Sequence, residues 1–337
     1  MVLCVLFQYE KRIVDLYHNC SEQPKTHHRR RFAWIFTRIC SGSEQIRYIL
    51  EDYKMPVCKV CFRHCVIKEG ETGFCGARIC RGGKIEAANY GRVTSLVLDP
   101  IEKKPLRSFF PGSLILSVGS YGCNLRCPFC QNHEISWSQK AMRYESEADE
   151  ISPEELANTA EYYRSRGNLG IAFTYNEPLI GYEFVRDTAA LVHDKGMKNI
   201  MVTNGTAEIQ VLEELLPYID AMNIDLKGFT DSYYRDVLKG SRKMVMDFIE
   251  RAAKDCHIEL TTLIVPGEND TAEEMRNLSS WVSGLNNGRG KEEIPLHISR
   301  FFPRFRMLDR NATDVSLIYS LADIARENLK YVYTGNC

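Results

Sequence analysis

Six short segments rich in apolar and β-branched residues recur between residues 114 and 301 of this 337-residue chain, separated by helical patterns. Parallel strands in one sheet need crossover connections, which helices usually supply, so this alternation predicts parallel β/α units. Six units are too few for a closed eight-unit barrel, which leaves a partial barrel and a doubly wound sheet open. The segments span residues 114–120, 170–176, 199–205, 221–227, 258–266 and 295–301.

Two of the intervening helices carry signals of their own. Ser152 and Glu155 match a capping box, and Pro153 stands at the first helical position, so a helix is predicted to begin there. Apolar residues at helical spacing follow it and define another helix near the C-terminus. They are Leu156, Ala160 and Tyr163 in the first helix and Leu317, Leu321 and Ile324 in the second.

Polar side chains collect where the predicted strands end. In either arrangement ligands bind at the carboxyl ends of parallel strands, so these side chains mark the expected site. They are Cys123 and the residues after it, Asn176, Glu177, Asn204, Asp225, Lys227, His297 and Arg300.

The first strand is followed by "CNLRCPFC", with cysteines at positions 123, 127 and 130. Thiolates are soft ligands that suit zinc, copper(I) or iron-sulfur clusters, and a structural zinc site closes with four ligands. Three thiolates on a 4Fe-4S cluster leave one iron without a protein ligand, so an external molecule can chelate it. The alternative is a zinc site completed by a distant Cys or His.

A second set of cysteines lies nearer the N-terminus at C-x2-C-x3-C-x9-C spacing. Four thiolates can close a site, and the spacing fits both a small zinc knuckle and an auxiliary iron-sulfur cluster. Cys80 is close enough in sequence to serve as an alternative ligand. The set comprises Cys58, Cys61, Cys65 and Cys75.

Composition restricts the compartment and the partners. Thirteen cysteines in so long a chain are typical of a reducing, cytoplasmic protein rather than of a secreted disulfide scaffold. The net charge is −1, so no global field favours nucleic acid or an anionic membrane. No apolar run approaches the roughly 20 residues of a membrane span. Residues 1–50 are expected to form a weakly ordered extension.

The cysteine loop resembles that of the radical S-adenosylmethionine (SAM) superfamily, including the aromatic Phe129 directly before the third cysteine. "TYNEP", "TNG", "DLK", "LIVPGEND" and "HISRF" resemble motifs of its pyruvate formate-lyase activating enzymes. The resemblance implies that the cysteine triad holds a 4Fe-4S cluster and that Phe129 packs near the adenine of SAM. It also implies that Glu177 binds the SAM amino group. The remaining implied contacts, to ribose, carboxylate or adenine, are Asp225, Lys227 and His297. The strand-end rule adds Asn176, Asn204 and Arg300.

From about residue 55 onward the chain is similar to the AmmeMemoRadiSam system radical SAM enzymes, because the second cysteine set precedes "YGRVTSLVLDPIEKKPLRSFFPGS". This resemblance implies a partial (β/α)6 TIM-type barrel with a small cysteine-rich N-terminal metal-binding subdomain. The expected domains are an extension (1–50), the cysteine-rich subdomain (51–110) and the radical SAM core (111–337).

The function implied by the resemblance is reductive cleavage of SAM into methionine and a 5'-deoxyadenosyl radical, which abstracts hydrogen from a substrate. A low-potential donor such as flavodoxin or ferredoxin supplies the electron. The substrate is expected to be a protein residue, such as a glycine that becomes a glycyl radical, with a small molecule as the alternative. Two other classes of function stay open: a two-cluster ferredoxin-like electron carrier and a zinc-binding interaction module.

Overall fold

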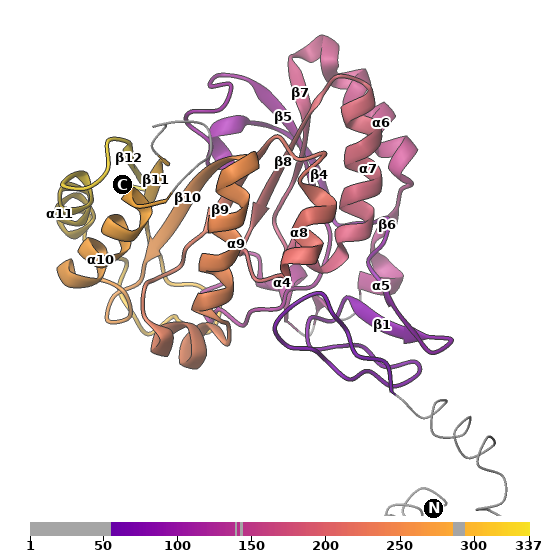
Figure 1. Cartoon of the computed structure of the whole chain (residues 1–337), viewed down its shortest axis with the longest axis horizontal. Helices are drawn as coiled ribbons and strands as arrows, with labels where there is room; N and C mark the ends of the chain where they lie inside the picture. The colour runs from indigo at the N-terminus through magenta and orange to yellow at the C-terminus, as the bar shows by residue number, and fades with distance from the viewer. Residues whose placement is uncertain (1–54, 139, 142–143, 286–293) are drawn as a thin grey trace, which may run out of the picture. The chain divides into compact units, whose positions relative to one another are not determined.

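The computed structural model describes residues 55–138, 140–141, 144–285 and 294–337. The predicted extension, residues 1–50, lies outside the described residues. An eight-stranded sheet forms the centre of the described chain (Figure 1). Its strands are β4 (Ser95–Pro100), β5 (Leu114–Gly119), β7 (Asn168–Phe173), β8 (Lys198–Thr203), β9 (Ala221–Asp225), β10 (His257–Ile264), β11 (Leu296–Arg300) and β12 (Val332–Gly335).

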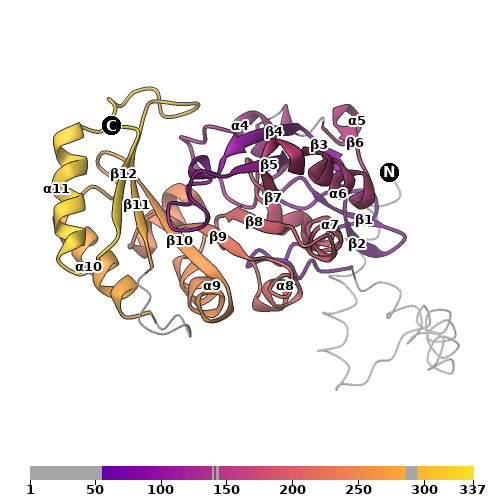
Figure 2. The same ribbon diagram turned by 90° about the horizontal axis from the view of Figure 1, so that it is seen from above.

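The strand order decides between the two arrangements that the sequence left open. The strands lie in the order in which they occur in the chain, from β4 to β12. All neighbours from β5 to β12 pair in parallel, whereas β4 pairs antiparallel with β5. A doubly wound sheet reverses its order at a switch point, and this sheet does not. Figure 2 shows the strands curving with the long helices outside the curve, which confirms the partial barrel.

Six helices connect the parallel strands, as the alternation predicted. The capping box is present, because the Glu155 amide donates to Ser152 Oγ at 3.2 Å and the Ser152 amide donates to Glu155 Oε2 at 2.8 Å. The second predicted stripe lies in the last helix. The helices are α6 (Pro153–Tyr162), α7 (Tyr182–Asp194), α8 (Ile209–Leu215), α9 (Arg242–Asp255), α10 (Ala272–Ser283) and α11 (Val315–Arg326).

The amino ends of the strands are closed by apolar packing. Ile115, Ala172 and Ile200, from three strands, form one buried cluster with Ile101 and Leu106. The last two belong to the segment between β4 and β5, which therefore covers this end of the barrel. Because this end is packed shut, the carboxyl end is left for a ligand.

The cysteine-rich segment forms a hairpin of β1 (Arg78–Arg81) and β2 (Lys84–Ala87). It lies in one compact unit, Met55–Cys337, with the barrel. β4 falls inside the predicted 51–110 subdomain but pairs in the main sheet, and the boundary near residue 110 stays a prediction. The shorter elements are β3 (Arg92–Val93), β6 (Asp149–Glu150), η1 (Ile101–Lys103), α4 (His133–Ser136), α5 (Tyr144–Glu147), η3 (Tyr163–Arg166), η4 (Pro178–Gly181) and η5 (Tyr233–Leu238).

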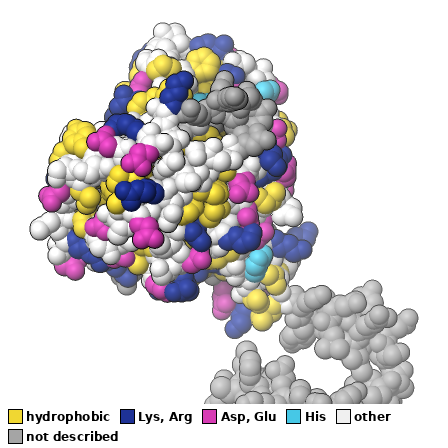
Figure 3. Space-filling model, turned by 60° about the vertical axis from the view of Figure 1, so that its left-hand side comes forward, with side chains coloured by type: hydrophobic (Ala, Val, Ile, Leu, Met, Phe, Trp, Pro, Cys, Tyr) yellow, Lys and Arg dark blue, Asp and Glu magenta, His cyan; other side chains and the backbone are white. Residues whose placement is uncertain are grey.

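The described surface agrees with the small net charge. On the face that Figure 3 shows, basic and acidic side chains are interspersed, without a broad field of one sign. Within the ranges that the structure describes, none of the helices combines the length and the apolar character of a membrane span.

Candidate functional site

The cysteine loop follows β5 directly and packs against the cysteine-rich segment. Gly122 adopts φ +91°, a left-handed conformation that favours glycine. A Cβ at Gly122 would lie 2.8 Å from both the Cys75 carbonyl oxygen and the Ala77 Cβ, so a side chain cannot fit. The Cys123 amide then donates to the Cys75 carbonyl at 3.2 Å. This hydrogen bond fixes the start of the loop against the second cysteine set.

The three predicted thiols lie close enough together to shift one another's pKa. We call them the thiol group. Burial raises the pKa of Cys123 well above its usual value, and the nearby Glu177, Cys127 and Cys130 raise it further. Burial likewise raises the pKa of Cys127 to about 12, against the opposing effect of Lys227. A buried thiol with a raised pKa becomes a thiolate readily only when a cation neutralises it. The group therefore fits a positively charged metal centre.

Two asparagines position Cys123. The Asn204 Nδ2 donates to Asn124 Oδ1 at 3.0 Å and lies 3.8 Å from the Cys123 sulfur. Asn124 is fully buried and its Nδ2 donates to the Thr206 carbonyl at 2.8 Å. The predicted residue Asn204 thus lies beside the cysteine loop, and its contacts are with protein groups. Asn124 was not predicted, although it stands inside the quoted motif.

Glu177 lies at the end of β7 and is buried. Its Oε1 accepts hydrogen bonds from the Thr203 hydroxyl at 2.6 Å and the Leu179 amide at 3.1 Å, and its Oε2 accepts one from the Asn204 amide at 2.8 Å. Burial raises the pKa of Glu177 to about 7, although these donors oppose the shift. A carboxylate has about four acceptor positions, so these bonds leave about one for a ligand.

The side chain of Asn176, the residue before Glu177, forms hydrogen bonds with backbone groups around the cysteine loop. Its Oδ1 accepts from the Ser120 amide at 3.0 Å, and its Nδ2 donates to the Tyr121 carbonyl at 3.1 Å and the Gly122 carbonyl at 3.3 Å. Asn176 therefore holds the end of β5 against the end of β7. It positions the loop, whereas the sequence predicted that it binds the cofactor.

Asp225 and Lys227 form an ion pair of 2.7 Å at the end of β9. Burial alone would lower the pKa of Lys227, but Asp225 and the Cys127 thiol outweigh burial and raise that pKa above its usual value. The Lys227 backbone is fixed on both sides: its amide donates to the Tyr234 hydroxyl at 2.9 Å, and its carbonyl accepts from Asn269 Nδ2 at 2.7 Å. The ion pair is thus held beside the cysteine loop.

His297 faces the inside of the barrel at the level of Asp225. Asp225 is in register with Thr261, and Thr261 with His297, and residues in register share a face of the sheet. The His297 Nε2 lies 2.6 Å from an oxygen of the buried Glu259. Burial would raise the pKa of Glu259, but hydrogen bonds from His257, His297 and two backbone amides lower it to about 2.

Arg300 is placed differently from the other predicted residues. Strand alternation directs it to the face of β11 opposite His297. Its Nε donates to the Thr313 carbonyl at 2.6 Å. The structure does not bring Arg300 to the thiol group, and its role in cofactor binding stays a prediction. The strand-end rule identifies the end of a strand but not the face on which each side chain lies.

Phe129 packs beneath the third cysteine. Its ring is buried and meets the Phe301 ring edge to face, with centroids 6.2 Å apart. The Arg306 amide donates to the Pro128 carbonyl at 2.9 Å, so the segment after β11 supports the cysteine loop. The predicted contact between Phe129 and adenine stays a prediction.

A polar network not predicted from the sequence lies on the β4 side of the barrel. Tyr175, in the "TYNEP" segment, has φ +74°, which is uncommon for a residue other than glycine. Its hydroxyl donates to Asp99 at 2.7 Å, and the buried Lys104 pairs with the same carboxylate at 2.9 Å. Gly119 allows this arrangement, because a Cβ there would lie 2.8 Å from the Tyr175 ring.

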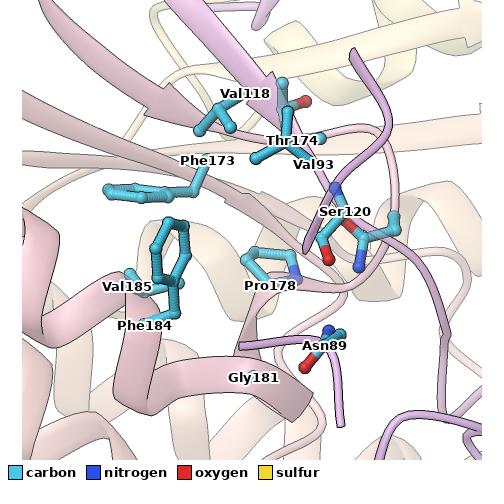
Figure 4. Close-up of a pocket in the computed structure, with 12 residues that line it drawn as sticks. Asn89, Val93, Val118, Ser120, Phe173, Thr174, Pro178, Gly181, Phe184 and Val185 are labelled. Atoms are coloured by element: carbon cyan, nitrogen blue, oxygen red, sulfur yellow. The ribbon is translucent and has the colours of Figure 1, made fainter. Parts of the chain in front are cut away.

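A pocket lies on another side of the "TYNEP" segment (Figure 4). Figure 4 shows side chains from β5, from β7 and from the start of α7 around it. None of the cysteines from either set lines this pocket, so it is separate from the thiol group. Among its lining residues are Asn89, Val93, Val118, Phe173, Pro178 and Phe184.

Comparison with known proteins agrees with this geometry. The family model described as the radical SAM superfamily matches residues 117–279, which include the three cysteines. An uncharacterized protein of Methanocaldococcus jannaschii is 41% identical over 290 residues, covering 85% of this chain and 83% of that protein. This chain belongs to the radical SAM superfamily.

Two further comparisons extend the assignment. Pyruvate formate-lyase 1-activating enzyme of Escherichia coli is 25% identical over 182 residues, covering 52% of this chain and 71% of that enzyme. Streptococcus suis SuiB bound to S-adenosylmethionine matches with a TM-score of 0.50 and 12% identity, covering 64% of this chain and 48% of that one, and shows the fold alone.

These matches confirm several predictions from the sequence. The chain is a radical SAM enzyme related to the glycyl-radical activating enzymes. Radical SAM enzymes use a 4Fe-4S cluster and SAM, which confirms the predicted cofactors. The narrower assignment to the AmmeMemoRadiSam system stays a prediction.

Proposed function

We propose that Cys123, Cys127 and Cys130 hold the 4Fe-4S cluster and that its fourth iron chelates SAM. The observation that carries this proposal is the convergence of three thiols from one loop with an acid and an ion pair from two other strand ends. When bound, the cluster and SAM supply reductive cleavage to methionine and a 5'-deoxyadenosyl radical, which takes a hydrogen atom from the substrate.

The chain's own residues orient the cosubstrate in this proposal. Glu177 uses its remaining acceptor position for the SAM ammonium, and Asp225 accepts from the ribose hydroxyls. Lys227 lies beside Asp225 and the Cys127 thiol, where its ammonium attracts the SAM carboxylate. His297 faces the same interior and borders the space for substrate and adenine.

Charge supports this division of roles. SAM carries an ammonium, a carboxylate and a sulfonium, so its recognition needs both acidic and basic groups. Glu177 and Asp225 provide the acidic groups, and Lys227 provides the basic one. A zinc-binding module has no need for such a set beside its thiolates, because a structural zinc site is already complete with four protein ligands.

For the substrate we propose a residue of a partner protein. The support is the relation to pyruvate formate-lyase 1-activating enzyme, whose name states that it activates a protein. The radical takes hydrogen from a glycine or another residue of that partner. A low-potential donor of the flavodoxin or ferredoxin class supplies the electron.

The test uses the full chain, reconstituted anaerobically with iron and sulfide. With dithionite and SAM it is expected to release methionine and 5'-deoxyadenosine, measured by chromatography and mass spectrometry. A two-cluster electron carrier or a zinc module would release neither. When a partner protein labelled with deuterium at glycine is added, deuterium is expected in the 5'-deoxyadenosine. Labelled small molecules that transfer deuterium when the partner does not would contradict the protein substrate.

A further inference from the structure

The four cysteines of the second set surround one cavity. The cavity is enclosed largely by apolar groups, and two arginines also line it. Cys80 is absent from this lining, and its sulfur lies 3.5 Å from Glu69 instead. The structure therefore separates Cys80 from the set, against the expectation that it is an alternative ligand. The lining residues are Cys58, Val60, Cys61, Arg63, Cys65, Ile67, Gly73, Cys75, Arg78 and Ile180.

Local backbone contacts position these thiols. The Cys58 amide donates to the Cys65 carbonyl at 2.9 Å, which closes a tight loop around Cys61. Gly73 lets the returning chain approach this loop, because a Cβ there would lie 3.6 Å from the Cys65 sulfur and 3.0 Å from Ile67. The turn after Gly73 then brings Cys75 to the same cavity.

The cavity contains a buried cation, Arg78, whose side chain interacts with the Cys58 thiol. Arg78 is 5% exposed, and its terminal nitrogen pairs with Glu183 at 2.7 Å. Its Nε is buried without a hydrogen-bond partner. The guanidinium of Arg78 nevertheless lies beside two thiols of the set, Cys58 and Cys75. A cation in this position can donate to metal-bound thiolates or to the sulfur atoms of a cluster.

A cluster and a single ion need different arrangements of the four thiols. A zinc ion holds its thiolates about 2.3 Å from one centre, so the sulfurs crowd together. In a cubane cluster each thiolate binds a different iron, so the sulfurs lie farther apart. In the part of the chain that the structure describes, no three Cys, His, Asp or Glu side chains are placed to hold one ion. Four thiols around one cavity can supply one ligand to each iron of a cubane.

The second cavity is in direct contact with the first cysteine loop. The Cys75 carbonyl accepts from the Cys123 amide, so a ligand of each set takes part in one hydrogen bond of 3.2 Å. Arg63 lines the second cavity and its Nε donates to the Asn124 carbonyl at 2.9 Å. The Phe74 ring lies between Arg63 and Arg126, with guanidinium carbons 3.3 and 3.7 Å from its centroid.

We propose that Cys58, Cys61, Cys65 and Cys75 bind a second 4Fe-4S cluster, which passes electrons to the cluster at Cys123, Cys127 and Cys130. This inference rests on the proposed function for the first site. One electron enters from a low-potential donor of the flavodoxin or ferredoxin class and moves to the neighbouring cluster. The donor is oxidised by one electron, the first cluster is reduced by one, and no bond forms or breaks in the transfer. All four ligands of the second cluster come from protein, so SAM does not bind there.

Iron content and spectra test the second site without any activity. The full chain, reconstituted anaerobically, is expected to bind about eight irons, since each cubane holds about four. The triple variant Cys123→Ala, Cys127→Ala, Cys130→Ala is expected to keep about four, with a reduced-cluster EPR signal that SAM does not change. The double variant Cys58→Ala, Cys61→Ala is expected to keep about four, with a signal that SAM changes. Cys80→Ala is the matched control and is expected to keep all eight.

Two results would overturn the second cluster. One is zinc in a tetrahedral sulfur site of the triple variant, seen by X-ray absorption. The other is iron content of about four in the wild type that falls to zero in the triple variant. A variant that fails to fold is recognised by circular dichroism, and Cys65→Ser, a smaller change at a partly exposed ligand, then replaces the double variant.

Electron transfer between the sites has a separate readout. Because the two loops share a hydrogen bond, the reduced clusters are expected to interact magnetically. The EPR spectrum of the fully reduced wild type should then differ from the sum of the two variant spectra. A spectrum equal to that sum would contradict direct electron transfer. If the wild type binds eight irons and shows this interaction but releases no 5'-deoxyadenosine with SAM, the proposed function fails while the second site stands.

Discussion

The two cysteine sets are neighbours in the structure, yet their surroundings differ. The first set has three thiols, and the side chains around it are charged: Glu177, Asp225 and Lys227. The second set has four thiols around a cavity with mostly apolar walls, and its charged neighbours Arg63 and Arg78 are both basic. The first arrangement can bind a cosubstrate that carries both signs of charge. In our proposal the second binds a cluster through protein ligands only.

If both proposals hold, this difference teaches that ligand number and environment together separate a site for chemistry from a site for electron transfer. A missing ligand becomes useful only when nearby groups can orient the molecule that fills the position. A complete ligand set needs shielding from water and little else. Each prediction below changes one of the sets or one of its neighbours.

The largest effect is expected for Cys127→Ala. Without the Cys127 thiolate the first cluster is expected not to assemble, so formation of 5'-deoxyadenosine should fall to the level of a control without enzyme. Chromatography of the products measures this loss. The matched control is Cys256→Ala, because Cys256 is a buried cysteine outside both sets. Loss of activity in both variants would show that the effect is general destabilisation.

The next effect is a pH dependence of the unfolding free energy that Glu177 causes. Burial raises its pKa from the usual 4.5 to about 7, so the folded chain binds the proton more tightly than the unfolded chain. Its contribution to stability is therefore complete below about pH 4.5 and is lost as pH rises through 7. The lost free energy is about 3 kcal/mol. Glu177→Gln removes this loss, so the variant should gain stability relative to wild type between pH 5 and pH 8.

Denaturant unfolding of both chains at several pH values measures the difference for Glu177. A difference in unfolding free energy that is constant with pH would contradict the raised pKa. The control is Glu155→Gln, which changes an exposed carboxylate of the α6 capping box. Its pKa is lowered by the hydrogen bond from the Ser152 backbone, so its contribution is lost at low pH instead.

A smaller effect is expected for Lys227→Met. The variant keeps the volume of the side chain but leaves Asp225 without its partner and removes the cation beside Cys127. We expect KM for SAM to rise about tenfold, as is typical when a group that supports a metal site is lost. Steady-state kinetics with dithionite measure it. Lys243→Met, which breaks an exposed ion pair on α9, should leave KM unchanged.

The smallest effect on SAM cleavage is expected for Cys61→Ala. Cys61 lines the second cavity, so its loss removes the second cluster but leaves the first site complete. With dithionite, a small reductant, the rate of 5'-deoxyadenosine formation should stay within about threefold of wild type, because the electron has another route. With a donor protein the rate should fall more. Complete loss with dithionite in a folded variant would contradict the separation of the two sites.

Much of the fold could be predicted from the sequence because its strands are apolar and regularly spaced. All six predicted strands are present, and the Ser152 capping box begins α6 as expected. β4 and β12 were not predicted. β4 lies at an edge of the sheet with most of its residues exposed or partly exposed, and β12 has only four residues, so neither presents a long apolar run. The choice between a partial barrel and a doubly wound sheet could not be made from the sequence, because it depends on which strands are neighbours.

The site was predictable to the extent that the chemistry lies in short motifs. The three thiols, Glu177 and Lys227 come together as their motifs indicated. Asn124 and Asn269 were missed, because their roles depend on backbone groups distant in sequence. The position of Arg300 apart from the thiols could not be predicted, because the end of a strand was known but not the face on which its side chain lies.

The central claim is that one iron of the first cluster lacks a protein ligand and binds SAM. Electron-nuclear double resonance of the reduced enzyme with SAM labelled with ¹⁵N in the amino group and ¹⁷O in the carboxylate tests it most directly. The account predicts hyperfine coupling from both labels, in the wild type and equally in the Cys61→Ala variant. Absence of coupling from both labels, in protein that carries the reduced first cluster, would contradict it.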